Sequence, residues 1–570
     1  MPVNKSNLNT RAESSNSYDA IVIGSGMSGG WAAKELCEKG LKTLVLERGR
    51  DVKHIEDYPT ATKHIWEFPY RNNLPPDVIG ENPIVSRCYA FREATEHFFV
   101  KDHEHPYVQK NPFDWIRGYQ VGGRSLLWAR MVQRWSEFDF EANLNDGHGI
   151  DWPIRYGDLA PWYSHVEKFA GISGNRDGLP QIPDGEFLPP MEMNCVEKHF
   201  KEQVEAKMAN RDVVISRTAN LSRPHNGRRC LYRSLCERGC PFGGYFSANS
   251  TTLPAAADTG NMTLRPHSVV HSIIYDEEKG KAAGVRVIDA YTKEIMEFYS
   301  DIIFVNAGSL NSLLILMNST SGRFPEGLGN DSGVLGRYML FHNYRGGVSA
   351  QMDGYRDRHY SGYRPTGCYI PRFRNFGSDR QRDFLRGYSL SFGANRATGN
   401  LEAAEQPLGA DFKEKLVEPG GWNAWLGGMG EVLPHRDNKV SLSRDKTDEW
   451  GIPQLEIDIT YSENDEKMVE DMLTASAEMF ETAGFKNIRV NDTEQAPGLD
   501  IHEMGGARMG KDPEESILNG MNQMHAVPNV FVSDGACMTS SACQNPSLTY
   551  MAITARAVHY AVEELKKGNI

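Results

Sequence analysis

Short apolar runs followed by glycine or by a helical pattern mark both ends of the chain. Residues 20–23 (Ala-Ile-Val-Ile) and 44–46 (Leu-Val-Leu) are apolar throughout, which is typical of parallel strands buried on both faces. Residues 302–308 and 530–535 have the same character, and each run ends in small or acidic residues. Apolar residues recur with a helical spacing after the first run and again over 546–565. These patterns predict an α/β unit with a parallel sheet, built from both ends of the chain.

The middle of the chain has a different texture. In residues 264–303, apolar and polar positions alternate on both sides of a turn, which predicts an antiparallel meander. From residue 341 to 499, alternating strands and long polar loops surround one predicted helix at 465–483, so a second, mainly antiparallel domain with a helical cover is expected. The predicted fold class is α/β with an α+β two-domain organisation. The expected division is a flexible tail at 1–16, a discontinuous nucleotide-binding domain at 17–160, 215–340 and 495–570, and a substrate-binding domain at 161–214 and 341–494.

Length and charge narrow the classes of function. A chain of 570 residues exceeds the size at which single hydrophobic cores stop growing, which agrees with two domains. The net charge of −13 disfavours nucleic acid or a membrane surface as a general partner, because both attract basic patches. No uninterrupted apolar stretch is long enough to predict a transmembrane segment. The polar N-terminal segment lacks the apolar core of a signal peptide, so export would depend on a signal carried by a partner.

Gly24, Gly26 and Gly29 form a G-x-G-x-x-G motif between the first predicted strand and its helix. Gly24 is predicted to form the tight turn, Gly26 to let the backbone approach a pyrophosphate, and Gly29 to let helix and strand pack closely. The helix N-terminus would direct amide N–H groups at the phosphates. Glu47, at the end of the second strand, is placed to accept hydrogen bonds from ribose hydroxyls. The motif predicts a bound dinucleotide but does not separate NAD from FAD.

Five segments together resemble the glucose-methanol-choline (GMC) oxidoreductase family. They are YDAIVIGSGMSGGWAAKEL at 18–36, VGGRSLLWARMV at 121–132, FVNAGSLNSLLILMNS at 304–319, HEMGGARMG at 502–510 and the segment at 529–557 that begins NVFVSDGACMTS. Their order along nearly the whole chain is the order of the family. The resemblance implies a Rossmann-like FAD-binding domain and a substrate domain, with FAD in an extended pose. It adds a further set of cofactor-binding residues: Gly122, Gly123, Ser125, Val270, Asp534 and Gly535.

The same matching implies a catalytic pair. His502 falls on the active-site histidine of the family, and Asn545, in QNPSLT, falls on its second active-site residue. Hydride transfer from an alcohol to flavin N5 requires loss of the hydroxyl proton, and a neutral imidazole suits that task. A neutral amide can hold the same oxygen without competing for the proton. His342, in YMLFHNYR, is the main rival for the role of base and is expected to be structural or to lie at the rim of the site.

One departure from the family concerns the flavin linkage. In the pyranose 2-oxidase branch, a histidine in the segment matching VGGRSLLW attaches covalently to the flavin. Leu127 occupies that place here and cannot form the bond. We therefore expect the FAD to be bound non-covalently.

Cys230, Cys236 and Cys240 lie within eleven residues of a chain that has only nine cysteines. A disulfide would leave one of the three unpaired, and a closed zinc site would need a fourth ligand, for which His225 is the nearby candidate. Three thiolates also suit an iron–sulfur cluster that lacks one corner. The segment resembles the cysteine loop of bacterial FAD-dependent glucose and glucoside dehydrogenases, which implies a three-iron cluster. Reduced cysteines packed in a loop are the alternative.

Within the family, these features resemble FAD-dependent sugar dehydrogenases, in particular glucoside 3-dehydrogenase large subunits. The resemblance implies oxidation of a secondary hydroxyl of a sugar or glycoside to a ketone, with C3 favoured and with a cytochrome or quinone as acceptor. A C1 or C2 sugar oxidase, a gluconate-type dehydrogenase and a non-catalytic FAD-binding subunit are the alternatives. A small signal-bearing subunit would carry the chain to the periplasm, and the cytoplasm is the alternative compartment. Trp128, Trp422 and Trp425 could stack on a sugar face.

Overall fold

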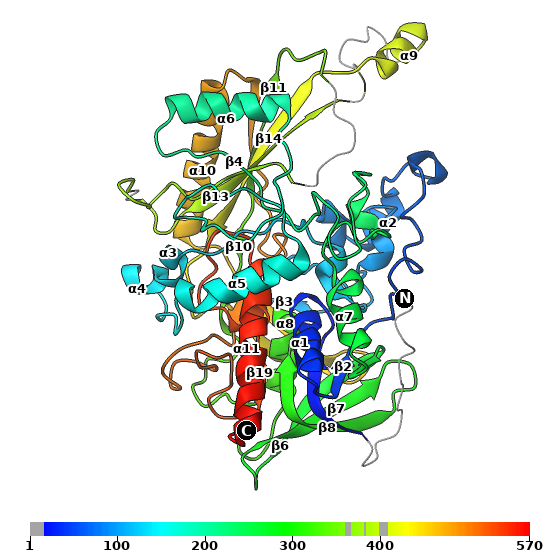
Figure 1. Ribbon diagram of the computed structural model, residues 1–570, viewed down its shortest axis with the longest axis vertical. Helices are drawn as coiled ribbons and strands as arrows, with labels where there is room; N and C mark the ends of the chain where they lie inside the picture. The colour runs from blue at the N-terminus through cyan, green and yellow to red at the C-terminus, as the bar shows by residue number, and fades with distance from the viewer. Residues whose placement is uncertain (1–15, 359–365, 381–382, 398, 400–407) are drawn as a thin grey trace.

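The chain folds into two stacked regions, each built on a large sheet (Figure 1). The structure is a computed structural model in which residues 16–358, 366–380, 383–397, 399 and 408–570 are described. The predicted tail at 1–16 lies outside these residues except for Asn16. In Figure 1 the lower region holds the N-terminal strands and the C-terminal helix, and the upper region holds the antiparallel sheet with two covering helices. This arrangement of mixed α/β layers confirms the predicted fold class.

The lower sheet is parallel at its centre. Its order is β5 (Met262–Arg265), β2 (Thr43–Leu46), β1 (Ser17–Ile23), β8 (Ile295–Val305), β7 (Lys281–Asp289) and β6 (Ser268–Asp276), with β19 (Val530–Val532) also paired to β8. Strands β5, β2, β1, β8 and β19 pair in parallel, whereas β6, β7 and β8 form the predicted antiparallel meander. The two ends of the chain therefore meet in one sheet.

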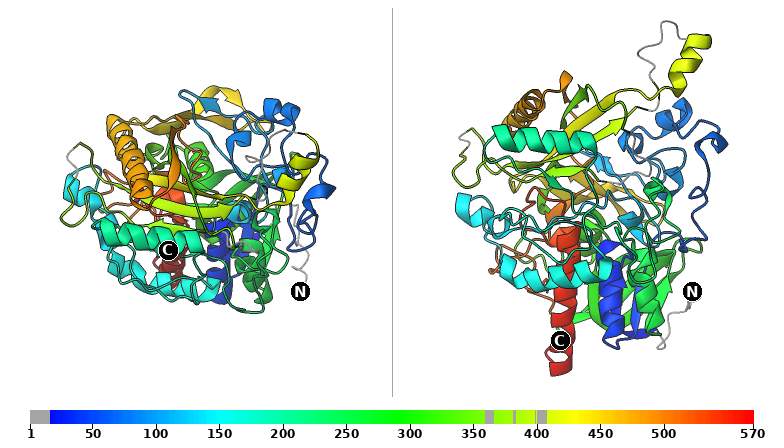
Figure 2. Two further views of the ribbon diagram at one scale, coloured as in Figure 1. Left: turned by 90° about the horizontal axis from the view of Figure 1, so that it is seen from above. Right: turned by 45° about the horizontal axis from the view of Figure 1, so that its top comes forward.

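Alternate residues of the central strands pack against different layers. Ala20 and Val22 belong to a core cluster with α1 (Met27–Glu38) and the C-terminal helix α11 (Ser547–Lys567), whereas Ile21 and Ile23 belong to a second cluster with α8 (Ser309–Asn318). Both faces of the sheet are thus buried, which explains why these strands are apolar throughout. Helices α1 and α11 run side by side in both views of the molecule, and α5 (Tyr156–Ala170) and α7 (Thr252–Asp258) flank them (Figure 2).

The upper sheet is antiparallel. Its order is β17 (Lys486–Asp492), β11 (Gly346–Met352), β14 (Trp422–Glu431), β13 (Tyr388–Arg396), β12 (Cys368–Ile370) and β4 (Val214–Ile215), with β10 (His342–Asn343) paired to β14. Helices α10 (Glu463–Thr482) and α6 (Cys195–Lys207) cover it, and α10 is the helix predicted at 465–483. Helix α10 begins after Ser462, whose hydroxyl and backbone N–H both bond Asp465 in a capping box.

A third sheet, which the sequence pattern did not separate, packs against α8 and shares the core of the lower region. Its order is β18 (Met504–Gly506), β9 (Arg337–Leu340), β15 (Lys439–Thr447), β16 (Pro453–Asp458) and β3 (Val108–Gln109). These strands come from four distant parts of the chain, and several pairings consist of only one or two residue pairs. Such short strands carry little periodic signal of their own. The predicted domain boundaries stay a prediction.

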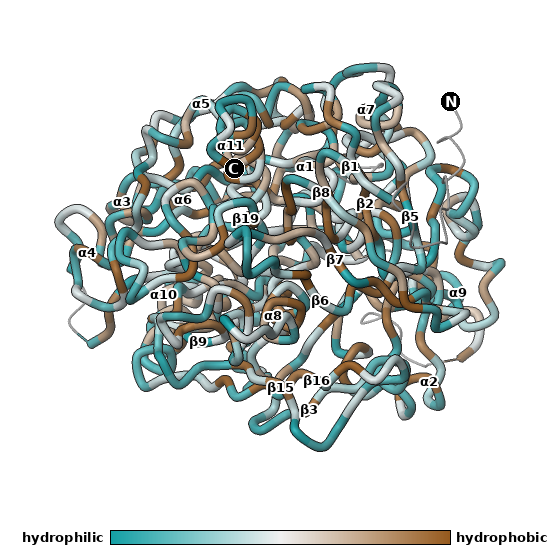
Figure 3. The backbone as a smooth tube through the Cα atoms, turned by 90° about the horizontal axis from the view of Figure 1, so that it is seen from below, coloured by the Kyte–Doolittle hydropathy of each residue, from teal (hydrophilic) through white to brown (hydrophobic). Residues whose placement is uncertain are grey.

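The remaining segments are short. Residues 51–105 are mostly loops, and they include the helix α2 (Pro76–Glu81), which begins at Pro76 because a proline fits the first helical turn. Hydrophobic stretches lie mainly inside the molecule and hydrophilic residues on its outer loops (Figure 3). Within the described residues, no helix combines the length and the apolar character needed to span a membrane. The other short helices are α3 (Glu137–Phe140), α4 (Ala142–Asp146) and α9 (Ala410–Val417), with single 3-10 turns that include η4 (Gly123–Leu126), η5 (Cys236–Arg238) and η8 (Gly535–Cys537).

Candidate active site

A cavity of about 540 Å³ lies where the two regions meet. Its walls come from the C-terminal ends of β1, β2 and β8, from the segment that contains η4, from β13 and β14 of the upper sheet, and from residues 499–503 and 534–550. Parallel sheets bind ligands at the carboxyl ends of their strands, so this position is the one expected for a cofactor. The volume is within the range of clefts that hold small-molecule ligands.

The first glycine motif forms one end of this cavity. Gly24 has φ +95°, and a Cβ there would lie 2.3 Å from the carbonyl oxygen of Asn306. A Cβ on Gly29 would lie 1.9 Å from the Gly24 carbonyl oxygen, so both positions exclude any side chain. Gly26 is different, because a Cβ there would meet no atom nearer than 3.9 Å. Gly24 and Gly26 line the cavity together with the first turn of α1, whereas Gly29 packs behind the turn.

Glu47 ends β2 on the cavity wall. Its carboxylate accepts hydrogen bonds from the backbone N–H groups of Ser25, at 3.2 Å, and Gly49, at 2.9 Å. Burial raises the pKa of this carboxyl above its usual range, although these hydrogen bonds favour the charged form. Glu47 therefore links the glycine turn to the strand that follows it. The predicted contact with a ribose stays a prediction.

The other predicted cofactor residues converge on the same cavity with one exception. Gly123, Ser125, Val270, Asp534 and Gly535 all line it. Gly122 does not line the cavity. It lies behind Gly123, and its N–H donates to the Ser25 hydroxyl at 3.0 Å. Segments that lie hundreds of residues apart thus form one binding surface.

Asp534 fastens the turn between β8 and α8. Its Oδ2 accepts from the Gly308 N–H at 2.9 Å and from the Ser312 hydroxyl at 2.6 Å, and its Oδ1 accepts from the Ala536 N–H at 3.0 Å. Burial raises the pKa of Asp534 to about 6 despite these donors. The side chain shapes the cavity wall and also faces the cavity.

His502 and Asn545 line the same cavity, as the matched motifs imply. Nδ1 of His502 lies 2.9 Å from Nδ1 of His342, a residue 160 positions earlier in the chain. Burial lowers the pKa of His502 far below its usual range, so the imidazole is neutral at physiological pH. Asn545 is buried, and its Oδ1 has no hydrogen-bond partner among the described residues. An orphaned amide oxygen on a cavity wall is a position for a ligand.

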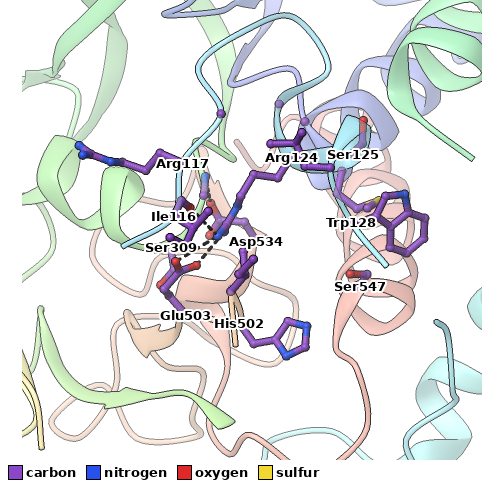
Figure 4. Close-up of a pocket in the computed structure, with 18 of the residues that line it drawn as sticks. Ile116, Arg117, Arg124, Ser125, Trp128, Ser309, His502, Glu503, Asp534 and Ser547 are labelled. Atoms are coloured by element: carbon purple, nitrogen blue, oxygen red, sulfur yellow. Dashed lines mark hydrogen bonds and ion pairs between the residues drawn. The ribbon is translucent and has the colours of Figure 1, made fainter. Parts of the chain in front are cut away.

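Sequence reasoning missed an ion pair beside His502. Arg124 reaches from η4 to Glu503, with N–O distances of 3.0 Å for Nη1–Oε1 and 2.7 Å for Nη2–Oε2 (Figure 4). Figure 4 shows the imidazole of His502 directed away from this pair. Both partners adjoin predicted residues, since Arg124 follows Gly123 and Glu503 follows His502. The motifs pointed to both positions, but nothing in the sequence indicated that the two side chains pair with each other.

The residues present fit FAD. Gly26 leaves the cavity open where a pyrophosphate would approach, and the N-terminal turn of α1 lines that place with backbone N–H groups. At the other end, polar atoms of Asn545 and Tyr550 on the cavity wall lack partners among the described residues. Leu127, also on the wall, offers no atom for a covalent flavin bond.

Comparisons with known proteins agree with this arrangement. Residues 18–343 and 434–554 match the N- and C-terminal family models of the GMC oxidoreductases. The chain is 29% identical to 2-methyl-1,2-propanediol dehydrogenase of Mycolicibacterium austroafricanum, over 96% of this chain and 95% of that protein. It is 25% identical to the fructose dehydrogenase large subunit of Gluconobacter japonicus, over 97% of this chain and 99% of that protein. Among solved structures, pyridoxine 4-oxidase from Mesorbium loti shares the fold with a TM-score of 0.62 at 16% identity, covering 96% of this chain and 99% of that one.

A cavity that fits FAD, with a neutral histidine and an amide on its wall, defines a flavin-dependent oxidoreductase. The chain belongs to the GMC oxidoreductase family, whose members bind FAD and oxidise CH–OH groups of alcohols and sugars. The predicted family and enzyme class are therefore confirmed.

The three clustered cysteines lie outside this cavity. Each Sγ is within reach of a nitrogen donor: Cys230 of the Tyr232 N–H at 3.3 Å, Cys240 of the Gly244 N–H at 3.3 Å, and Cys236 of the Asn220 amide at 3.7 Å. All three thiols are free and half-buried. Among the described residues, the three Sγ atoms do not all lie within 4.8 Å of one another. This spacing disfavours the zinc alternative with His225, whose imidazole instead contacts the Phe169 carbonyl.

Proposed function

We propose that the protein oxidises a secondary hydroxyl of a sugar or glycoside, at C3 by preference, to a ketone. The observation that carries the proposal is that His502 and Asn545 line the cavity that fits FAD. His502, kept neutral by burial, takes the hydroxyl proton, and the Asn545 amide holds the same oxygen. FAD, when bound, supplies the acceptor for the hydride that leaves the carbon. The O–H and C–H bonds break, a C=O bond forms, and the proton remains on the imidazole.

The upper sheet supports a sugar as substrate. Trp425, on β14, lines the cavity and is 43% exposed, and its indole lies against Gly393 and Gly427, which leave room for it. An indole with one free face suits the apolar face of a pyranose. Trp128 also lines the cavity, whereas Trp422 is buried elsewhere, with its Nε1 donating to the Tyr355 carbonyl. The similarity to a fructose dehydrogenase large subunit supports the same class of substrate.

The FAD is bound non-covalently in this proposal. Leu127 packs with only 7% of its surface exposed at the place where the pyranose 2-oxidase branch has its linking histidine. The affinity for FAD then depends on non-covalent contacts, including those of the glycine turns that line the cavity.

We place an iron–sulfur cluster of the three-iron type at Cys230, Cys236 and Cys240. N–H donors directed at cysteine sulfur stabilise cluster-bound thiolates. Arg130 gives a second argument. It is 4% exposed, its Nε and Nη1 lack partners among the described residues, and it lines a small cavity of about 240 Å³ with Cys236. A buried guanidinium needs a negative partner, and thiolates that hold a cluster would supply it.

The cluster would pass electrons to an acceptor other than oxygen, such as a cytochrome or a quinone. Segment 124–131 connects the two sites, since Trp128 and Met131 line the FAD cavity and Arg130 lies beside Cys236. The name of the fructose dehydrogenase large subunit indicates that this relative has partner subunits. A small signal-bearing subunit, with export to the periplasm, is the corresponding proposal for this protein, and a cytoplasmic location is the alternative.

The test mixes the FAD-loaded protein with sugars, glycosides and small diols without oxygen, and follows loss of the oxidised flavin absorbance. Rapid bleaching by a sugar, with a 3-keto product located by NMR, supports the proposal. A ketone or lactone at C1 or C2, or preference for gluconate or a diol, replaces the proposed substrate with an alternative. Oxygen consumption compared with dye reduction separates oxidase from dehydrogenase. Absence of bleaching by every substrate would indicate a non-catalytic FAD-binding subunit.

A further inference from the structure

His342 and His502 form a buried imidazole pair whose hydrogen bonds define the protonation of each ring. The rings meet at 88° with centroids 5.0 Å apart, and the two Nδ1 atoms are 2.9 Å apart. Nε2 of His342 lies 3.1 Å from the carbonyl oxygens of both Ser541 and Ala542. His342 is fully buried, and only His502 lines the cavity.

The carbonyls fix the tautomer of His342. A carbonyl oxygen only accepts hydrogen bonds, so Nε2 of His342 carries the proton. Burial lowers the pKa of His342 to about 4, so the ring is neutral and its Nδ1 is an acceptor. Nδ1 of His502 must then be the donor of the bond between the rings. The opposite arrangement would turn an Nε2 lone pair of His342 toward two carbonyl oxygens.

We propose that His342 is a positioning residue that holds His502 as the Nδ1–H tautomer, so that the Nε2 lone pair of His502 faces the substrate hydroxyl. His342 does not touch the cavity and acts only through His502. This inference rests on the proposed function for the identity of the base, but the tautomer itself does not depend on a substrate. This role differs from the structural or rim position expected for His342 from the sequence.

The pair also accounts for the fate of the proton. When the substrate O–H bond breaks, the proton would join Nε2 of His502, and bound FAD would supply the acceptor for the hydride released from the C–H bond. His502 then carries a positive charge, and its Nδ1–H still donates to the neutral His342. The two carbonyl acceptors behind His342 make its Nδ1 a better acceptor for this charged donor.

The charged groups around the pair come from several segments of the chain. Asp500 accepts the His342 backbone N–H at 2.8 Å. Glu431, opposite His342 on β14, is paired with Arg372 and Arg386.

Beside His502, Arg124 and Glu503 neutralise one another. Arg124 disfavours a charged His502, whereas Glu431 favours a charged His342. These influences oppose each other, and burial keeps both rings neutral.

The first test reads the tautomer directly. Holoenzyme labelled with ¹⁵N-histidine is examined by long-range ¹H–¹⁵N correlation, and the signals of His502 among the 17 histidines are assigned by their loss in His502→Gln. A neutral ring protonated at Nδ1 is the expected result. A ring protonated at Nε2, or a charged ring at pH 7, overturns the inference. This outcome stands whether or not any sugar reduces the flavin, so it is separate from a failure of the proposed function.

The second test uses two substitutions. His342→Leu removes the acceptor and should slow flavin reduction by about 10²-fold, within the range that acid–base help supplies, with little change in KM or FAD content. His342→Asn places an amide oxygen near the former Nδ1 and should restore most of the rate. His199→Leu is the matched control, because His199 also contacts a backbone carbonyl, that of Ala483, but lies far from the cavity on α6.

Equal loss in the Leu and Asn variants would assign His342 a packing role and overturn the inference. A wild-type rate and an unchanged pH profile in His342→Leu would overturn it as well. If His342→Leu does not fold, the NMR measurement on the wild-type protein decides alone.

Discussion

Arg124 and Glu503 form a two-point ion pair that joins the glycine-rich segment of η4 to the residue after His502. The Glu503 side chain is 2% exposed, and Arg124 is its ion-pair partner. The two residues are 379 positions apart. The pair therefore holds the cofactor-facing turn and the catalytic segment in one geometry.

Removal of Arg124 should weaken this geometry. Arg124→Leu leaves a buried carboxylate unpaired, and breaking a buried pair typically costs about 3–5 kcal/mol. We expect a lower free energy of unfolding in denaturant titrations and a lower FAD content after gel filtration. Arg124→Leu combined with Glu503→Gln should lose less than the sum of the single changes, because no unpaired charge remains. Strict additivity would show that the two side chains do not interact.

The flavin should leave the polypeptide under denaturing conditions, because Leu127 cannot form a covalent link. Precipitation with acid, followed by absorbance of the supernatant, should recover all the FAD. Leu127→His places an imidazole at this position, so release of FAD from this variant is compared with release from the wild type. Yellow colour that stays with the washed wild-type precipitate would refute the non-covalent proposal.

Cys236→Ser should separate reduction of the flavin by sugar from transfer of the electrons to an acceptor. We expect the variant to lose iron and its broad visible absorbance, and to stop reducing ferricyanide, while sugar still bleaches the flavin at the wild-type rate. Cys195→Ser is the control, since Cys195 is also free and half-buried but begins the distant helix α6. Absence of iron from wild-type protein prepared without oxygen would show that the three cysteines hold no iron–sulfur cluster.

Asp500 should make stability depend on pH. Burial, with the negative charge of Glu503 nearby, raises the pKa of Asp500 to about 7, against an ordinary value near 4 in the unfolded chain. Between these values the folded protein binds a proton that the unfolded chain does not, so this group costs stability as pH rises from about 4 to about 7. Asp500→Asn lacks this cost.

The melting temperature of Asp500→Asn should therefore exceed that of the wild type at pH 8, and the difference should shrink toward pH 5. Asp258→Asn, which changes an exposed carboxyl, should show no such trend. A difference that is the same at both pH values would argue that Asp500 is ionised in the folded protein throughout.

The parts of the fold that depend on local pattern could be predicted. The runs at 20–23 and 44–46 lie within β1 and β2, and the helices predicted at 465–483 and 546–565 match α10 and α11 closely. Apolar periodicity and glycine punctuation act over a few residues, so a single sequence displays them. His502 and Asn545 were predicted from the family resemblance of their motifs, and the structure places both on the cavity wall.

Relations between distant segments could not be predicted. The third sheet unites strands such as β3 and β16, and nothing in the sequence of β3 indicates its partner. His342 looked like a separate, structural histidine because its contact with His502 exists only in the folded chain. Pairings of this kind depend on tertiary packing, which local propensity does not encode.

If His502 removes the hydroxyl proton of a sugar at a bound flavin, His502→Gln should lose that step. Rapid mixing without oxygen should show fast bleaching of wild-type flavin by sugar. The FAD-loaded variant should bleach slower by about 10²–10⁴-fold, with FAD content unchanged. Bleaching of the variant at the wild-type rate, or no bleaching of the wild type by any sugar, would contradict the account.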